Sequence, residues 1–169
     1  MAQKVVAHFI DHHMVKGTSF DVDIQKPVCH VRTEDQGTVE VDITQLKALY
    51  FVKDFGGNPK YDETNDPAAD DIRLRGSTQI NITFQDGEQL GGLTNRYPPR
   101  GPQFFVLPMD PKSNNTRILI NRDAVASIEV RQPESAAPSP EASPTIPRPR
   151  RSSWVFDGKD IKTVHPDER

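Results

Sequence analysis

Short runs of alternating apolar and polar residues occupy most of the first 130 positions of the chain. Residues 5–9 (VVAHF) and 80–84 (INITF) show this alternation clearly. A period of two predicts half-buried β-strands, and no stretch keeps a helical period for more than about two turns. We therefore expect an all-β protein, in which residues 44–51 form a one-turn bend that leads into a strand.

The alternating segments occur twice along the chain. An offset of 75 aligns residues 5–17 with residues 80–92 and matches a phenylalanine, an aspartate and a glycine in the two copies. The second copy has an Asp86-Gly87 hairpin turn, and His12 and His13 fill that turn in the first copy. Further matches at later positions predict a duplicated unit with a loop about four residues longer in the second copy. They are residues 28–31 with 104–107, and residues 41–49 with 120–128.

Composition divides the chain into five parts. They are a first β repeat (1–53), an acidic linker rich in Gly and Pro (54–77), a second β repeat (78–130), a Pro/Ser/Ala linker (131–151) and a short C-terminal motif (152–169). A block of about 50 residues is marginal alone, so we expect the two repeats to pack into one pseudo-symmetric body. The later linker has too few apolar residues to offset the entropy of ordering, which predicts a disordered tail.

Charge and cysteine content exclude several classes of protein. The net charge of −3 argues against a protein held on nucleic acid by bulk electrostatics. The single cysteine, Cys29, excludes an internal disulfide framework and lies in an apolar strand, where a buried and inert thiol is expected. No apolar run reaches the length of a membrane helix, and the first residues lack a signal peptide, so we expect a cytoplasmic protein.

The repeated pattern resembles a known small barrel. Residues 80–92 followed by residues 120–128 are similar to the Sm-like barrels that include the bacterial host-factor RNA chaperones, and residues 5–17 with 41–49 follow the same pattern less closely. The resemblance implies two tandem small β-barrels and an RNA-binding function. Sm-like RNA sites use a basic or aromatic loop, where this chain has Asn-Arg-Asp at 121–123 and Asp-Ile-Thr at 42–44. Nucleic acid is therefore not the favoured partner.

Two longer phrases point to a second resemblance. VVAHF-D-VKG (residues 5–17) and LKALYFVKDFxGN (residues 46–58) are similar to an uncharacterised family of bacterial domains. The similarity covers most of residues 4–130. It implies a bacterial domain without an assigned reaction.

Four polar residues of the second repeat form a candidate ligand site. Arg96 and Arg100 make an R-x-x-x-R pair, and Asp110 and Ser113 follow as D-x-x-S. This arrangement resembles PilZ domains, in which two arginines bind the phosphates of cyclic di-GMP, as guanidinium geometry favours. The alternative is a pair of solvated arginines on a loop stiffened by proline.

The sequence predicts neither a catalytic centre nor a metal site. His8, His12, His13 and His30 gather in the first repeat, but neighbouring histidines in strands and turns point apart, so we expect surface histidines. The acidic residues 62–71 lack the regular spacing of a calcium loop. Nucleophile-elbow, phosphate-loop and zinc-protease motifs are missing, which favours a protein that is not an enzyme and needs no cofactor.

The C-terminal motif carries the remaining candidates. Trp154 and Phe156 follow the proline-rich linker and are candidate anchors for a partner protein, or for docking onto the chain's own domain. Ser152 and Ser153 follow a basic run, as basophilic kinases prefer, so phosphorylation would change the local charge.

We therefore expect a non-catalytic bacterial regulatory or adaptor module that binds a partner protein, with a role in signal transduction. The alternatives are a sensor of cyclic dinucleotides or another anionic ligand, and an Sm-like RNA binder. Open barrel edges would also permit homo-oligomers.

Overall fold

The computed structural model describes residues 1–132, in which the fold is all-β, as the sequence predicts. These residues form ten antiparallel strands and three 3-10 helices of three residues each, and no helix among them is long and apolar enough to cross a membrane. The elements are β1 (Gln3–Phe9), β2 (Met14–Ser19), β3 (Val28–Arg32), β4 (Thr38–Asp42), η1 (Ile43–Gln45), β5 (Leu46–Val52), η2 (Ile72–Leu74), β6 (Thr78–Phe84), β7 (Gln89–Thr94), β8 (Gln103–Pro108), β9 (Asn115–Asn121), η3 (Arg122–Ala124) and β10 (Val125–Val130). The expected bend before the fifth strand is η1, and it recurs as η3 before β10.

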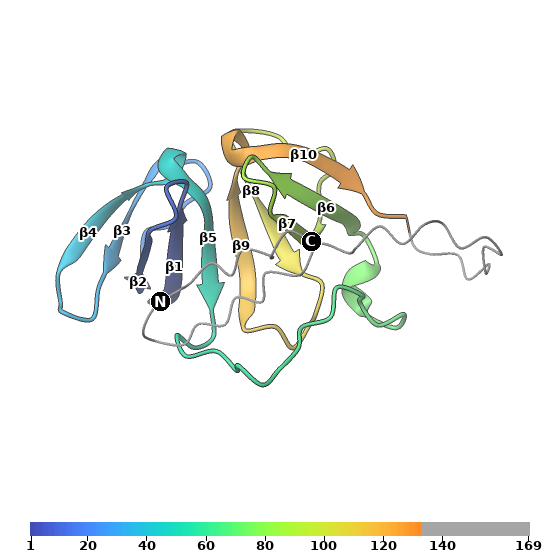
Figure 1. Cartoon of the computed structure of the whole chain (residues 1–169), viewed down its shortest axis with the longest axis horizontal. Coiled ribbons are helices and arrows are strands. Elements are labelled where there is room, and N and C mark those ends of the chain that lie inside the picture. The colour runs from blue at the N-terminus through green and yellow to red at the C-terminus, as the bar shows by residue number, and fades with distance from the viewer. Residues whose placement is uncertain (133–169) are drawn as a thin grey trace, which may run out of the picture.

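The ten strands form one continuous sheet that consists of two equivalent halves. Its order is β10-β6-β7-β8-β9-β5-β1-β2-β3-β4. Each half has its last strand beside its first, and the halves join where β5 pairs with β9, as Figure 1 shows near the centre of the molecule. The sheet therefore ends at β10 on one side and at β4 on the other.

The strand registers repeat from one half to the other. Thr18 pairs with Arg32 in the first half, and Leu93 pairs with Leu107 in the second, an offset of 75 for both residues. The alignment of residues 28–31 with 104–107 is thus wrong by one position, because Val28 corresponds to Gln103. A slip of one residue would exchange the two faces of a strand. The offset rises to 79 at β4 and β9, so the four extra residues lie between β8 and β9.

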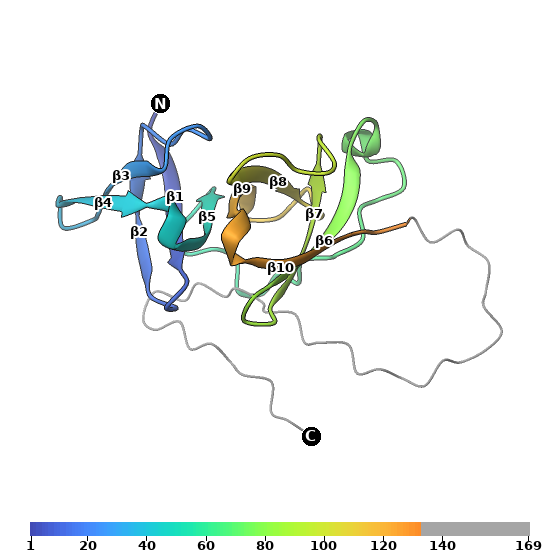
Figure 2. The same cartoon turned by 90° about the horizontal axis from the view of Figure 1, so that it is seen from above.

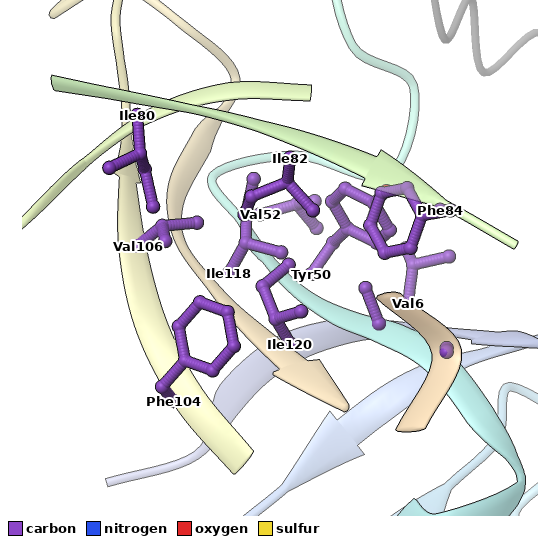
Figure 3. Close-up of a cluster of buried hydrophobic side chains, with 12 residues drawn as sticks. Val6, Tyr50, Val52, Ile80, Ile82, Phe84, Phe104, Val106, Ile118 and Ile120 are labelled. Carbon is purple, nitrogen blue, oxygen red and sulfur yellow. The ribbon is translucent and has the colours of Figure 1, made fainter. Parts of the chain in front are cut away.

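Strand β5 is buried on both faces because it separates two hydrophobic clusters. Tyr50 and Val52 contribute to the cluster of the second half, drawn in Figure 3, while Leu49 and Phe51 contribute to the cluster of the first half. All seven residues of the strand are buried. The apolar run LKALYFV therefore marks a central strand that has core on each side.

Candidate functional site

Asp110 and Ser113, two of the four predicted ligand-binding residues, are buried and hold the acidic segment 54–77. The Asp110 carboxylate accepts hydrogen bonds from the Tyr61 hydroxyl at 2.6 Å and the Thr64 N–H at 3.1 Å. Ser113 donates to Glu63 at 2.7 Å. Burial alone would raise the pKa of Asp110, but its hydrogen bonds outweigh burial and lower that pKa. The hydrogen bond from Tyr61 to Asp110 raises the pKa of Tyr61 to about 12.

Arg96 and Arg100 are exposed on the loop between β7 and β8. Among residues 1–132 neither arginine side chain has a hydrogen bond or ion pair, and neither contacts Asp110 or Ser113. The two pairs lie at opposite ends of the six-residue strand β8, about 20 Å apart along the strand. The four predicted residues therefore do not form one site.

The acidic segment 54–77 is attached to the body at several further points. Arg73 donates to the carbonyls of Pro108 at 2.9 Å and Met109 at 2.8 Å, and it pairs with Asp71 at 2.6 Å. Arg131 pairs with the side chain of Asp66. The segment lacks strands, but these contacts make it a packed strap and not a freely solvated linker.

The expectation of four surface histidines is wrong for His8. Its side chain is buried, and burial lowers its pKa to about 4, together with the nearby Lys47 and His12. His30 is exposed, and its Nδ1 lies 2.7 Å from an oxygen of Asp21, which raises its pKa. Within the described part of the chain no group of three His, Cys, Asp or Glu side chains is arranged to hold a metal ion.

A buried lysine, which the sequence patterns do not single out, joins the two halves. Lys47 Nζ lies 2.7 Å from an oxygen of Asp86, also pairs with Glu88, and sits 4.7 Å from the centre of the Phe84 ring. Burial lowers the pKa of Lys47, while the hydrogen bond to Asp86 opposes that shift. The one signal in the sequence is that Lys47 is the only charged residue in the apolar run LKALYFV. Its contacts with both carboxylates give it a structural role.

Two equivalent loops form a surface that we call the loop face, namely residues 20–27 between β2 and β3 and residues 95–102 between β7 and β8. Figure 2 shows the two loops near each other. The Gln103 side-chain amide donates to the carbonyls of Asp23, Ile24 and Lys26 at 3.2, 2.5 and 3.0 Å. One buried side chain of the second half thereby fixes the loop of the first half.

The loop face exposes apolar side chains on an ordered backbone. Phe20 is 71% exposed, Ile24 40% and Tyr97 45%. The residue after Phe20 is held as well, because Asp21 accepts hydrogen bonds from the Ser19 hydroxyl at 3.1 Å and the His30 N–H at 2.9 Å. Aromatic residues, together with arginines such as Arg96 and Arg100, are enriched at protein interfaces.

The candidate residues of the C-terminal motif, namely Ser152, Ser153, Trp154 and Phe156, lie outside the described residues.

A family model, described as a family of unknown function (DUF6982), matches residues 1–132. No curated protein and no solved structure matches the chain.

Proposed function

The chain belongs to the DUF6982 family of unknown function, and we propose that it is a non-catalytic, cytoplasmic adaptor that binds a partner protein through the loop face. The observation that carries this proposal is the position of Phe20. Phe20 is 71% exposed, yet the carbonyls of Asp23 and Ile24 on the same loop are hydrogen bonded to Gln103. A large apolar side chain that is exposed to water on an ordered loop loses little further conformational entropy on binding, so it is suited to recognition.

The polar residues that could have supported chemistry instead have structural contacts. Asp110 and Ser113 hold the strap, and Lys47 bridges the halves. Cys29 is buried, and burial raises its pKa to about 11, so the thiol is not a nucleophile at neutral pH. These assignments favour a binding role, which we place in bacterial signal transduction.

Site-specific photo-crosslinking in the native host tests the adaptor function. A photoreactive phenylalanine analogue at position 20 should capture one dominant partner. The same analogue at Ile10 is the control, because Ile10 is 52% exposed in the turn between β1 and β2, at the opposite end of β2 from residues 20–27. With the partner purified, Phe20→Ala should weaken binding at least about tenfold, as for interface anchors. Identical adducts at positions 20 and 10 would contradict the proposal.

The hydrogen bonds from Gln103 to residues 23–26 allow a second test of the loop face. Gln103→Met keeps the volume of the side chain but removes its hydrogen bonds to the loop, so the order of residues 23–26 should decrease. We expect weaker partner binding and faster amide hydrogen exchange at Lys26, while the exposed Gln89→Met changes neither. Unchanged partner binding, despite faster exchange in the loop, would show that the partner does not bind at the loop face.

A second candidate function is the binding of an anionic ligand such as a cyclic dinucleotide. It rests on Arg96 and Arg100, two exposed guanidinium groups four positions apart on one loop, which suit phosphate oxygens. A titration with cyclic dinucleotides should then show micromolar binding that Arg96→Ala/Arg100→Ala abolishes, while Asp110→Asn leaves it intact. Binding that also required Asp110 would contradict this site.

An Sm-like barrel is the finer proposal for each half, and the strand order supports it because the last strand of each half pairs with the first. RNA binding on that ground has weaker support in the second half. Asn121 is buried and donates to the carbonyls of Thr44 and Leu46 at 3.0 and 2.8 Å, so it contributes to the junction between the halves. Salt-sensitive retention of the protein on immobilised RNA would favour RNA binding.

A further inference from the structure

The sheet ends at β4 with an edge whose counterpart in the second half is covered. Strand β9 corresponds to β4, and β5 pairs along its outer edge, whereas no strand in residues 1–132 pairs with the outer edge of β4. Tyr50 faces Ile118 across that covered edge, and Ile118 is 1% exposed. Val39 is the counterpart of Ile118 and is 38% exposed. The β4 edge therefore has the geometry to accept one antiparallel strand.

Acidic residues outnumber basic ones around the β4 edge, where Arg32 of β3 pairs with Thr38. Residues 33–46 contain four acidic residues and no lysine or arginine. They are Glu34, Asp35, Glu40 and Asp42. An exposed strand edge attracts another strand, and this charge favours one that carries basic residues.

Strand β10 of a second copy does not fit this edge. It corresponds to β5, the strand that covers β9, but its chemistry differs at the positions that meet the neighbouring half. Ser127 replaces Ala48, Glu129 replaces Tyr50, and Arg131 follows in place of Val52. Glu129 would face Val39 and bring a further acidic residue to this surface, which disfavours β10 of a second copy as the added strand.

We propose that residues 148–156 of this chain (RPRRSSWVF) dock in the same molecule along the β4 edge as an additional antiparallel strand. Side chains alternate between the faces of a strand, so Trp154 and Phe156 lie on one face and Arg151 and Ser153 on the other. The aromatic face covers Val39, as Tyr50 covers Ile118. The other face lies beside Glu40.

The chain is long enough for this docking. Ten strands give nine spacings of about 4.8 Å, so β10 and β4 are at most roughly 43 Å apart across the sheet. Residue 148 lies 16 positions after residue 132, and a proline-rich chain extends about 3.1 Å per residue, or roughly 50 Å. The tail can therefore reach from one end of the sheet to the other.

The docking would also respond to phosphorylation. A phosphate on Ser153 would lie on the face next to Glu40, and like charges there repel. Ser152→Asp/Ser153→Asp should therefore weaken the docking of Trp154.

Trp154 is the sole tryptophan of the chain, so its fluorescence in the full-length protein reports the docking directly. We expect a blue-shifted emission and weak quenching by acrylamide. Quenching should increase at least about threefold in Glu34→Lys/Glu40→Lys, because the attraction to the basic run is reversed. The control Asp62→Lys/Glu129→Lys makes the same change of charge away from β4 and should leave quenching unchanged.

Amide hydrogen exchange locates the docked segment. Exchange in residues 38–42 should be slower in the full-length protein than in Trp154→Ser/Phe156→Ser, a variant whose changes lie outside residues 1–132. Emission typical of fully exposed tryptophan, or exchange at β4 that the tail variant leaves unchanged, would overturn the proposal. Shielding that increases with protein concentration would overturn docking within one molecule. These results do not depend on the loop face, so they stand apart from the proposed adaptor function.

Discussion

Lys47 of the first half lies 2.7 Å from Asp86 of the second, measured from Nζ to the carboxylate oxygen. Lys47 is the extra residue in the bulge between β1 and β5, and Ala126 occupies the same place in the bulge between β6 and β10. The two bulges are equivalent, yet only one carries a charge. A charged residue on one bulge thus fixes how the first half sits on the second.

Replacing Lys47 with methionine should lower the free energy of unfolding by about 2 to 4 kcal/mol, because Asp86 and Glu88 lose their buried cation. Urea denaturation measures this change. Lys60→Met, at an exposed position of the strap, is the control and should shift the free energy by less than about 0.5 kcal/mol. Adding Asp86→Asn and Glu88→Gln to Lys47→Met should restore part of the loss; no recovery would mean that the ion pairs are not its cause.

The buried His8 should make stability depend on pH. Its pKa is about 4 in the folded state and 6.5 for an ordinary histidine, so between these values the unfolded state binds a proton that the folded state does not. The free energy of unfolding should therefore fall as pH drops through this window, by up to about 1.4 kcal/mol per pH unit. His8→Asn should flatten the dependence, while His12→Asn at an exposed turn should keep it. Equal slopes in the wild type and His8→Asn would contradict the assignment.

Gly17 should tolerate no side chain, because strands β2 and β3 approach closely there. A Cβ atom would lie 2.2 Å from the Arg32 carbonyl oxygen, compared with 3.1 Å from the Leu107 carbonyl at the equivalent Gly92. Gly17→Ala should cost at least about 2 kcal/mol of stability, and Gly92→Ala clearly less. Thermal unfolding of the two variants tests which one loses more stability. A larger loss for Gly92→Ala would contradict the closer approach of β2 and β3 at Gly17.

The four residues of the predicted ligand site should separate by their effect on stability. Asp110→Ala should lower the free energy of unfolding by about 1 to 3 kcal/mol, because the strap loses the acceptor for Tyr61 and Thr64. Arg96→Ala/Arg100→Ala should change it by less than about 0.5 kcal/mol. Chemical denaturation distinguishes the two. A marked loss for the arginine pair would reveal a structural role on the loop.

Much of the fold could be predicted from local patterns. The period of two gave the strands, and the offset between residues 5–17 and 80–92 gave the duplication. The larger offset between residues 41–49 and 120–128 gave the longer loop. The bend before β5 followed from residues 44–51 in the same way. These features depend on residues close together in the chain, where each side chain's place on a strand is set by its neighbours.

The sequence by itself determined the all-β class and the repeat, and the tertiary structure decided what the polar residues do. The pairing of β5 with β9 buries Lys47 beside Asp86, and the strap occupies Asp110 and Ser113. Such contacts join residues about 40 to 50 positions apart, and they depend on which face of one half covers the other. No local period encodes that choice, because it arises from long-range packing.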